Sequence, residues 1–152
     1  MKKILIYMLL LAAVVLIPVK GTDIGKLIPV EVVQVVANGE TVVITTDMGE
    51  TGMGIDVKSA AENLKATTAG IVFLDTADYL LVNEAAKDEA AELKEYLKPS
   101  VSVCGVEGEI DMKEAAAFLN VHRPVCKLRD VSEVELQEVL VMEEGRMMLK
   151  RK

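Results

Sequence analysis

The segment from Tyr79 to Val82 constrains the fold more than any other part of the sequence. Its four residues, YLLV, are all apolar, and the polar residues Asp78 and Asn83 flank them. A continuous apolar run of this kind is typical of a strand that is buried on both faces. Leu80 and Leu81 would then point to opposite sides of a sheet, and both would be buried. The rest of the chain must therefore supply neighbouring strands and cover for the sheet.

The segments on either side of this strand alternate between strand and helix patterns. Two β-branched runs between Val30 and Asp47 flank Asn38-Gly39, which predicts a hairpin because Asn-Gly permits the positive φ angles of a type I′ turn. A strand is expected from Val101 to Val106, and a terminal hairpin around Glu144-Gly145. Helices are expected from Val57 to Thr67 after the N-cap Asp56, from Asn83 or Glu84 to Leu97, and from Met112 to about Asn120 after Asp111. The order β-β-α-β-α-β-α-β-β predicts an α/β (α+β) fold, a mixed sheet with about three helices.

The first 21 residues have the three parts of a secretory signal peptide. Lys2 and Lys3 precede an apolar run of 14 residues, Ile4 to Ile17, and the small residues Val19 and Gly21 would stand at −3 and −1 of a cleavage site before Thr22. The alternative is an uncleaved membrane anchor, although a spanning helix needs about 20 apolar residues. Residues 22–152 are then expected to form one exported domain that contacts a membrane only through the N-terminal segment.

Charge and composition disfavour several classes of partner. The chain has 17 basic and 24 acidic residues and a net charge of −7, and removal of residues 1–21 would leave a net charge of −10. An acidic domain of this kind is repelled by the phosphate backbone of nucleic acids. Aromatic residues make up 3% of the chain and Trp is absent, which argues against stacking platforms for single-stranded nucleic acids or sugars.

One acidic, glycine-rich segment between strand and helix patterns offers a candidate ligand site. It runs from Asp47 to Asp56 and reads as a flexible loop. Carboxylates at Asp47, Glu50 and Asp56 could bind Ca²⁺, although their spacing does not match an EF-hand loop. The plain interpretation is a connection in which Asp56 caps the following helix.

The two cysteines, Cys104 and Cys126, are a candidate disulfide because the chain is expected to be exported. The alternative is two small buried apolar residues. His122 lies four residues before Cys126, but no glycine-rich turn surrounds either thiol, which disfavours a Cys–His nucleophilic pair. No pattern assembles a nucleophile, a base and an oxyanion donor, so we expect neither an enzyme nor a cofactor.

The region from Asp56 to Leu119 resembles a known family. Ala60 to Leu64 (AAENL) has the pattern of an Ala-containing helix after a hairpin, and Ala69 to Val82 (AGIVFLDTADYLLV) leads into an acidic, Ala-rich helix. Val101-Ser102-Val103, followed by Val106-Glu107-Gly108, precedes a helix with Ala115-Ala116. Together these segments resemble the N-terminal domain of the spore germination protein Ger(x)C family, the C subunit of nutrient germinant receptors.

The sequence also departs from the pattern of that family. Asp75 and Ala77 stand where the family has His and Lys, and the lipobox Cys and the larger C-terminal part of the family have no counterpart. The resemblance implies a non-enzymatic protein displayed on the surface of an endospore former, with a role in sporulation or germination.

Two functions follow as expectations. The first is an exported interaction module that binds a protein partner at the outer face of the cytoplasmic or spore membrane. The second is a small secreted protein that binds a ligand or a metal through the acidic loop.

Overall fold

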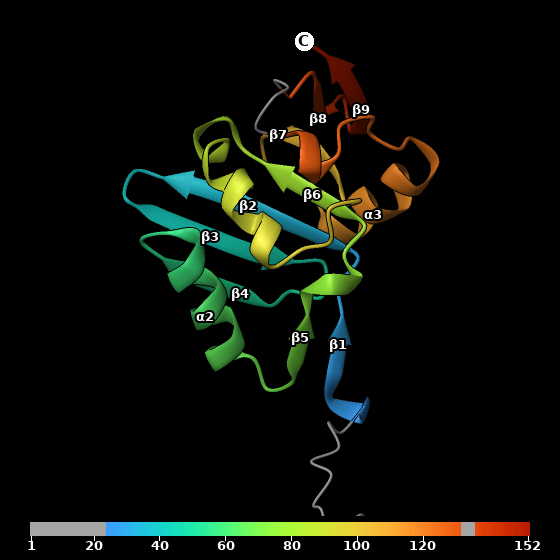
Figure 1. Ribbon diagram of the computed structural model, residues 1–152. Helices are drawn as coiled ribbons and strands as arrows, with labels where there is room; N and C mark the ends of the chain where they lie inside the picture. Colours follow the sequence, from blue (N-terminus) through green and yellow to red (C-terminus); the bar gives the residue numbers. More distant parts are fainter. Residues whose placement is uncertain (1–23, 132–135) are drawn as a thin grey trace, which may run out of the picture.

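The computed structural model describes residues 24–131 and 136–152, so the predicted export signal lies outside the described residues. The main element is a seven-stranded mixed sheet with the strand order β4-β3-β2-β6-β7-β8-β9 (Figure 1). Strands β2, β6, β7 and β8 run parallel to one another, and antiparallel hairpins flank them on both sides. The strands are β2 (Val32–Asn38), β3 (Thr41–Thr46), β4 (Thr51–Gly54), β6 (Tyr79–Val82), β7 (Ser102–Glu107), β8 (Glu138–Glu143) and β9 (Arg146–Arg151). The predicted α+β class is confirmed.

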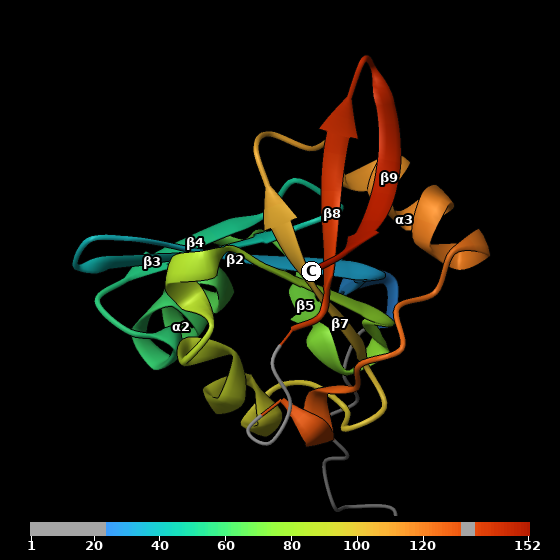
Figure 2. The same ribbon diagram turned by 90° about the horizontal axis from the view of Figure 1, so that it is seen from above.

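The sheet separates two hydrophobic cores, as the apolar run of β6 predicts. Leu80 and Leu81 are both fully buried and belong to different clusters of core residues. Helix α2 (Val57–Thr67) and a 3₁₀ segment (Glu89–Glu95) cover the Leu80 face, and α3 (Met112–Val121) covers the Leu81 face (Figures 1 and 2). Leu140 of β8 belongs to the Leu81 core as well, so the terminal hairpin is part of the same packed domain.

The two α-helices begin where their capping residues predict. Asp56 accepts a hydrogen bond from the backbone N–H of Ser59 at 2.7 Å, and the Ser59 hydroxyl bonds back to the Asp56 backbone, which completes a capping box. Asp111 accepts from the backbone N–H groups of Lys113 and Glu114.

The prediction of a second helix from Asn83 or Glu84 to Leu97 was wrong in its hydrogen-bond pattern. Residues 84–86 and 89–95 form 3₁₀ turns, so the observed element order does not match the predicted one. The stripe that predicted the helix is nevertheless buried, because 3₁₀ turns also bring residues three positions apart to one side. Its members are Ala86, Ala90, Leu93 and Leu97.

The segment predicted as a glycine-rich loop contains strand β4. Its glycines allow α2 to lie directly on the strand: a Cβ atom at Gly52 would approach the Ala60 carbonyl oxygen to 2.3 Å. At Gly54, a Cβ atom would approach the Ser59 hydroxyl to 2.2 Å. The glycines therefore serve close strand–helix packing and not loop flexibility.

Both predicted hairpins are present, with turn geometries that the sequence did not specify. In the first, Asn38 pairs with Thr41, and Gly39 has a φ of +63°, which fits a type II′ turn centred one residue later than predicted. In the second, Glu144 and Gly145 have φ angles of +50° and +74°, the signature of a type I′ turn.

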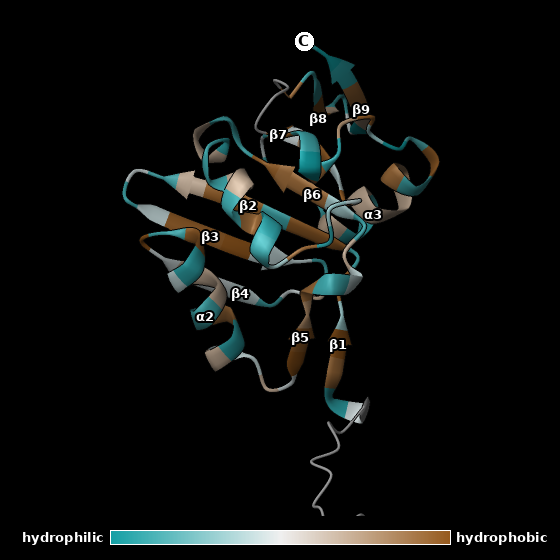
Figure 3. Cartoon of the chain, in the orientation of Figure 1, coloured by the Kyte–Doolittle hydropathy of each residue, from teal (hydrophilic) through white to brown (hydrophobic). Residues whose placement is uncertain are grey.

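A second, two-stranded parallel sheet joins β1 (Leu27–Pro29) to β5 (Ile71–Phe73). It lies beside the lower end of the main sheet and is largely hydrophobic (Figures 1 and 3). Val72 is buried, whereas Ile71 and Phe73 are 45% and 42% exposed. The small sheet therefore covers the domain with one face and presents apolar side chains on the other.

Candidate interaction surface

The three carboxylates of the predicted acidic site lie apart and have structural roles. Asp47 accepts hydrogen bonds from the backbone N–H groups at the start of β2, and Glu50 accepts one from the Thr68 hydroxyl at 3.2 Å. Asp56 caps α2, and its hydrogen bonds to Ser59 lower the pKa of its carboxyl group. Among the described residues, no group of three or more His, Cys, Asp or Glu side chains is placed to hold a metal ion.

Cys104 and Cys126 are both free thiols in the structure. Cys104 belongs to the Leu81 core, whereas Cys126 packs against the Leu80 core on the opposite face of the sheet. The predicted disulfide is not formed in this structure. Burial raises the pKa of the Cys104 thiol to about 12, and it also raises the pKa of the partly buried Cys126 thiol.

His122 does not pair with either thiol through any interaction among the described residues. Its ring lies against Phe118 with a centroid separation of 4.5 Å, and its backbone N–H closes the last turn of α3. The structure therefore offers no activated nucleophile at this point.

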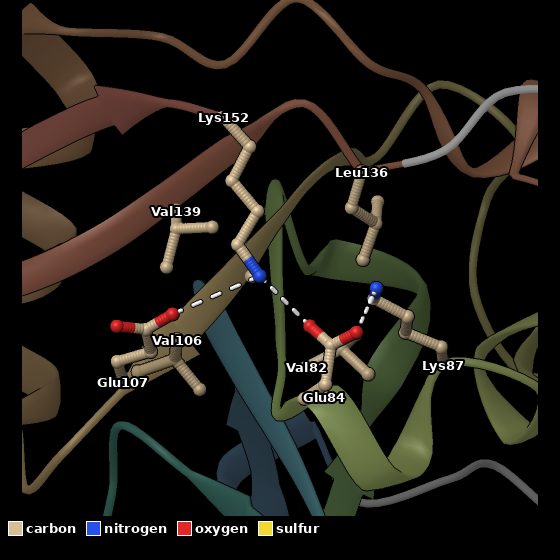
Figure 4. A pocket seen from close by; sticks show the side chains of 9 residues that line it. Val82, Glu84, Lys87, Val106, Glu107, Leu136, Val139 and Lys152 are labelled. Carbon is tan, nitrogen blue, oxygen red and sulfur yellow. Dashed lines mark hydrogen bonds and ion pairs between the residues drawn. The ribbon is translucent and has the colours of Figure 1, made fainter.

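The carboxyl ends of β6 and β7, where open α/β sheets commonly bind ligands, are closed by charged side chains. Lys152 lies between Glu84, at 2.9 Å, and Glu107, at 3.7 Å, and Lys87 pairs with Glu84 (Figure 4). These contacts lower the pKa of Glu84 and raise that of Lys152. The cavity beneath them measures about 10 Å³, which is at most the space of one water molecule.

A hollow lies between α3 and the terminal hairpin, on the Leu81 side of the sheet. We call it the α3–β9 groove, and its cavity volume is about 690 Å³. Val121 on α3 is 77% exposed and Met148 on β9 is 39% exposed, so the walls present apolar surface to solvent. The lining residues are Phe118, Val121, His122, Arg123, Glu138, Met147, Met148, Leu149 and Arg151.

Four residues of β9 line the groove, and β9 is an edge strand of the main sheet (Figure 2). The backbone N–H of Lys152 donates to the Gln137 carbonyl oxygen of the adjacent strand at 2.7 Å. Hydrogen-bonded pairs alternate in an antiparallel ladder, so the backbone groups of Met147, Leu149 and Arg151 point away from β8. Among the described residues, no hydrogen bond satisfies these outward N–H groups.

The opposite edge of the sheet, β4, is packed against a helix. There the outward N–H of Met53 on β4 donates to the Asn63 side chain of α2 at 3.0 Å. Helix α2 thus protects β4 from pairing with another strand, whereas β9 has no equivalent protection in the described part of the chain.

A partly buried hydrogen-bond chain holds the Arg123 side chain at the groove wall. Arg123 Nε donates to the Tyr79 hydroxyl at 3.2 Å, and that hydroxyl donates to Asn120 Oδ1 at 3.0 Å. Asn120 in turn donates to Glu31 at 2.6 Å. Within the described residues, no ion pair joins Arg123 to a carboxylate, so its terminal guanidinium nitrogens remain available to an anion.

A second apolar area lies on the part of the sheet that α3 does not cover. Val36, Val43 and Met53 are cross-strand neighbours on β2, β3 and β4, and Met53 is 58% exposed. None of these three residues lines the α3–β9 groove or the cavity beneath Lys152.

Sequence reasoning missed the groove because its two walls lie far apart in the chain. The available signals were the exposed Val121 at the end of α3 and the alternating pattern of β9, with basic residues at Arg146, Lys150 and Arg151.

No helix in the described residues has the length and hydrophobicity needed to span a membrane. The chain matches no protein-family model, no curated protein and no solved structure.

Proposed function

We propose that this chain is an exported, non-enzymatic interaction module that binds a protein partner at the outer face of the cytoplasmic or spore membrane. The observation that carries the proposal is the α3–β9 groove, whose lining mixes exposed apolar and charged side chains, beside an edge strand that no other described segment covers. Exposed apolar surface of this kind is typical of sites where proteins bind partners. The signal-like residues 1–21 support export, and the resemblance to the Ger(x)C N-terminal domain supports the spore setting.

The polar groups of the domain support a binding role over a catalytic one. Each of the acidic loop residues has a structural hydrogen-bond partner, and the site at the carboxyl ends of β6 and β7 is closed by ion pairs. The groove instead combines apolar walls with a fixed arginine, which suits recognition of a polypeptide.

Site-specific photocrosslinking tests the proposal in an endospore-forming host that expresses the full chain. A photoreactive amino acid at Val121 should give one discrete crosslinked product in the membrane or spore fraction. The matched control is Ile55, which is 81% exposed and lies outside the groove. If a photoreactive residue at Met53 gives a crosslinked product and one at Val121 gives none, the binding surface is the open face of β2–β4 and not the groove. Equal labelling from Val121 and Ile55 would contradict a specific partner.

The same sample tests export. We expect the intact mass of the recovered protein to match a chain that begins at or near Thr22. Retention of residues 1–21 in a membrane-bound protein would identify the segment as an anchor, and recovery from the cytosol would contradict the proposal.

A further inference from the structure

We infer that the partner enters the α3–β9 groove as an extended segment that adds a strand to β9, with apolar and acidic residues in alternation. The inference rests on the proposed function and specifies how the partner is recognised. Addition of a strand to a free sheet edge is an established mode of peptide recognition, in which backbone hydrogen bonds supply affinity and alternate side chains supply specificity.

The backbone of β9 offers the hydrogen bonds that such a strand needs. The outward N–H and C=O groups of Met147, Leu149 and Arg151 are spaced two residues apart along the edge, which is the spacing of an antiparallel or parallel ladder. At the other edge of the sheet, the Asn63 side chain already accepts from the outward N–H of Met53, and α2 packs directly on β4.

The two faces of β9 differ, and this difference sets the alternation of the partner. Met147 and Leu149 pack on the Leu81 core and line the groove, so partner residues on that side should be apolar. Arg146, Met148 and Lys150 alternate with them along the strand; Met148 also borders the groove and Lys150 pairs with Glu143, whereas Arg146 has no carboxylate partner among the described residues. Partner residues on this side should be acidic.

Arg123 adds a fixed positive charge at the wall of the groove. Its Nε is held by the Tyr79 hydroxyl, and its guanidinium lies 5.7 Å from the centre of the Tyr79 ring. A carboxylate of the partner can therefore reach the terminal guanidinium nitrogens without reorganisation of the side chain.

The charge of β9 disfavours a second copy of this chain as the occupant. Antiparallel pairing of β9 with its own copy, centred on Met148, would place Arg146 opposite Lys150 of the other copy. Like charges directly opposite each other destabilise a strand pair. An acidic strand from a different protein satisfies the same backbone groups and neutralises these cations.

The test uses the purified domain, residues 22–152, after circular dichroism has shown that it is folded. The probe is a displayed library of random ten-residue peptides, selected on the wild type. We expect the enriched peptides to show apolar residues at every second position with Asp or Glu between them. Enrichment of a helical pattern, or the same enrichment on Val121→Glu, would overturn the inference. Ile55→Glu is the matched control and should bind as the wild type does.

Backbone methylation of one enriched peptide distinguishes strand addition from simple groove binding. Methyl groups on one set of alternate amide nitrogens should weaken binding about tenfold or more, whereas the other set should leave it unchanged, because only one set faces β9. Equal effects of both sets, or a domain that sediments as a dimer through β9, would overturn the inference. A crosslink from Val121 without this pattern would leave the proposed function intact and remove only the strand addition.

Discussion

Replacement of Leu80 and Leu81 by alanine, singly and together, tests the two-core arrangement. Both side chains are 0% exposed, and they belong to cores on opposite faces of β6. Each change removes three buried carbon atoms, which is worth about 2.4 kcal/mol at about 0.8 kcal/mol per group, before any cavity term. With the cavity included, each single change should lower the free energy of unfolding by about 2–5 kcal/mol.

The double variant carries the sharper result. Because the two side chains share no core, their effects should add to within about 0.5 kcal/mol. Urea unfolding followed by circular dichroism measures all three variants, and Val121→Ala, at a position 77% exposed, is the control expected to be silent. A silent Leu81→Ala would refute the separation into two cores, whereas a coupling energy above about 1 kcal/mol would show that the two cores affect each other through the backbone of β6.

Four further predictions concern other parts of the domain. Gly52→Ala should destabilise it by about 1–3 kcal/mol, measured by urea unfolding, because the new Cβ would meet α2 at 2.3 Å; full stability would contradict the close packing. Asp56→Ala should lower the melting temperature at neutral pH. The folded-state pKa of Asp56 lies below its ordinary value of 3.8, so the difference in melting temperature between wild type and Asp56→Ala should shrink as the pH falls through that folded pKa. A difference in melting temperature that persists in acid would contradict the charged cap. The Cys104 thiol, with a pKa of about 12, should resist iodoacetamide at pH 8 in the native protein and react after unfolding, as read by mass spectrometry. Millimolar Ca²⁺ should leave the melting temperature unchanged, and a rise abolished by Asp56→Ala would restore the acidic segment as a calcium site.

Local signals in the sequence were sufficient for much of the fold. The cap at Asp56 and the apolar spacing after it located α2 with its observed bounds, because both depend on neighbours within one or two turns. The unbroken apolar run of β6 identified a strand buried on both faces, because burial on both faces requires apolar residues at every position of the strand itself.

The errors arose where distant segments decide the structure. Gly52 and Gly54 have the appearance of a flexible loop in sequence, and only the approach of α2 explains them as strand residues. Strands β1 and β5 each have three residues and gain stability by pairing across more than 40 positions, which no local pattern reports. The groove is likewise a product of tertiary structure, because α3 and β9 meet only after the sheet between them has formed.

The pairing of β1 with β5 also determines how the domain responds to mechanical force. The two strands are parallel, and Leu27, Ile28 and Pro29 lie opposite Ile71, Val72 and Phe73. A pull on the chain at the N-terminal end of β1 acts along the strand and must displace all of its cross-strand bonds together, in shear. The same strands pulled apart from one end would separate one bond at a time. Tension that enters along β1 from its N-terminal side would therefore load the bonds of this short pair together.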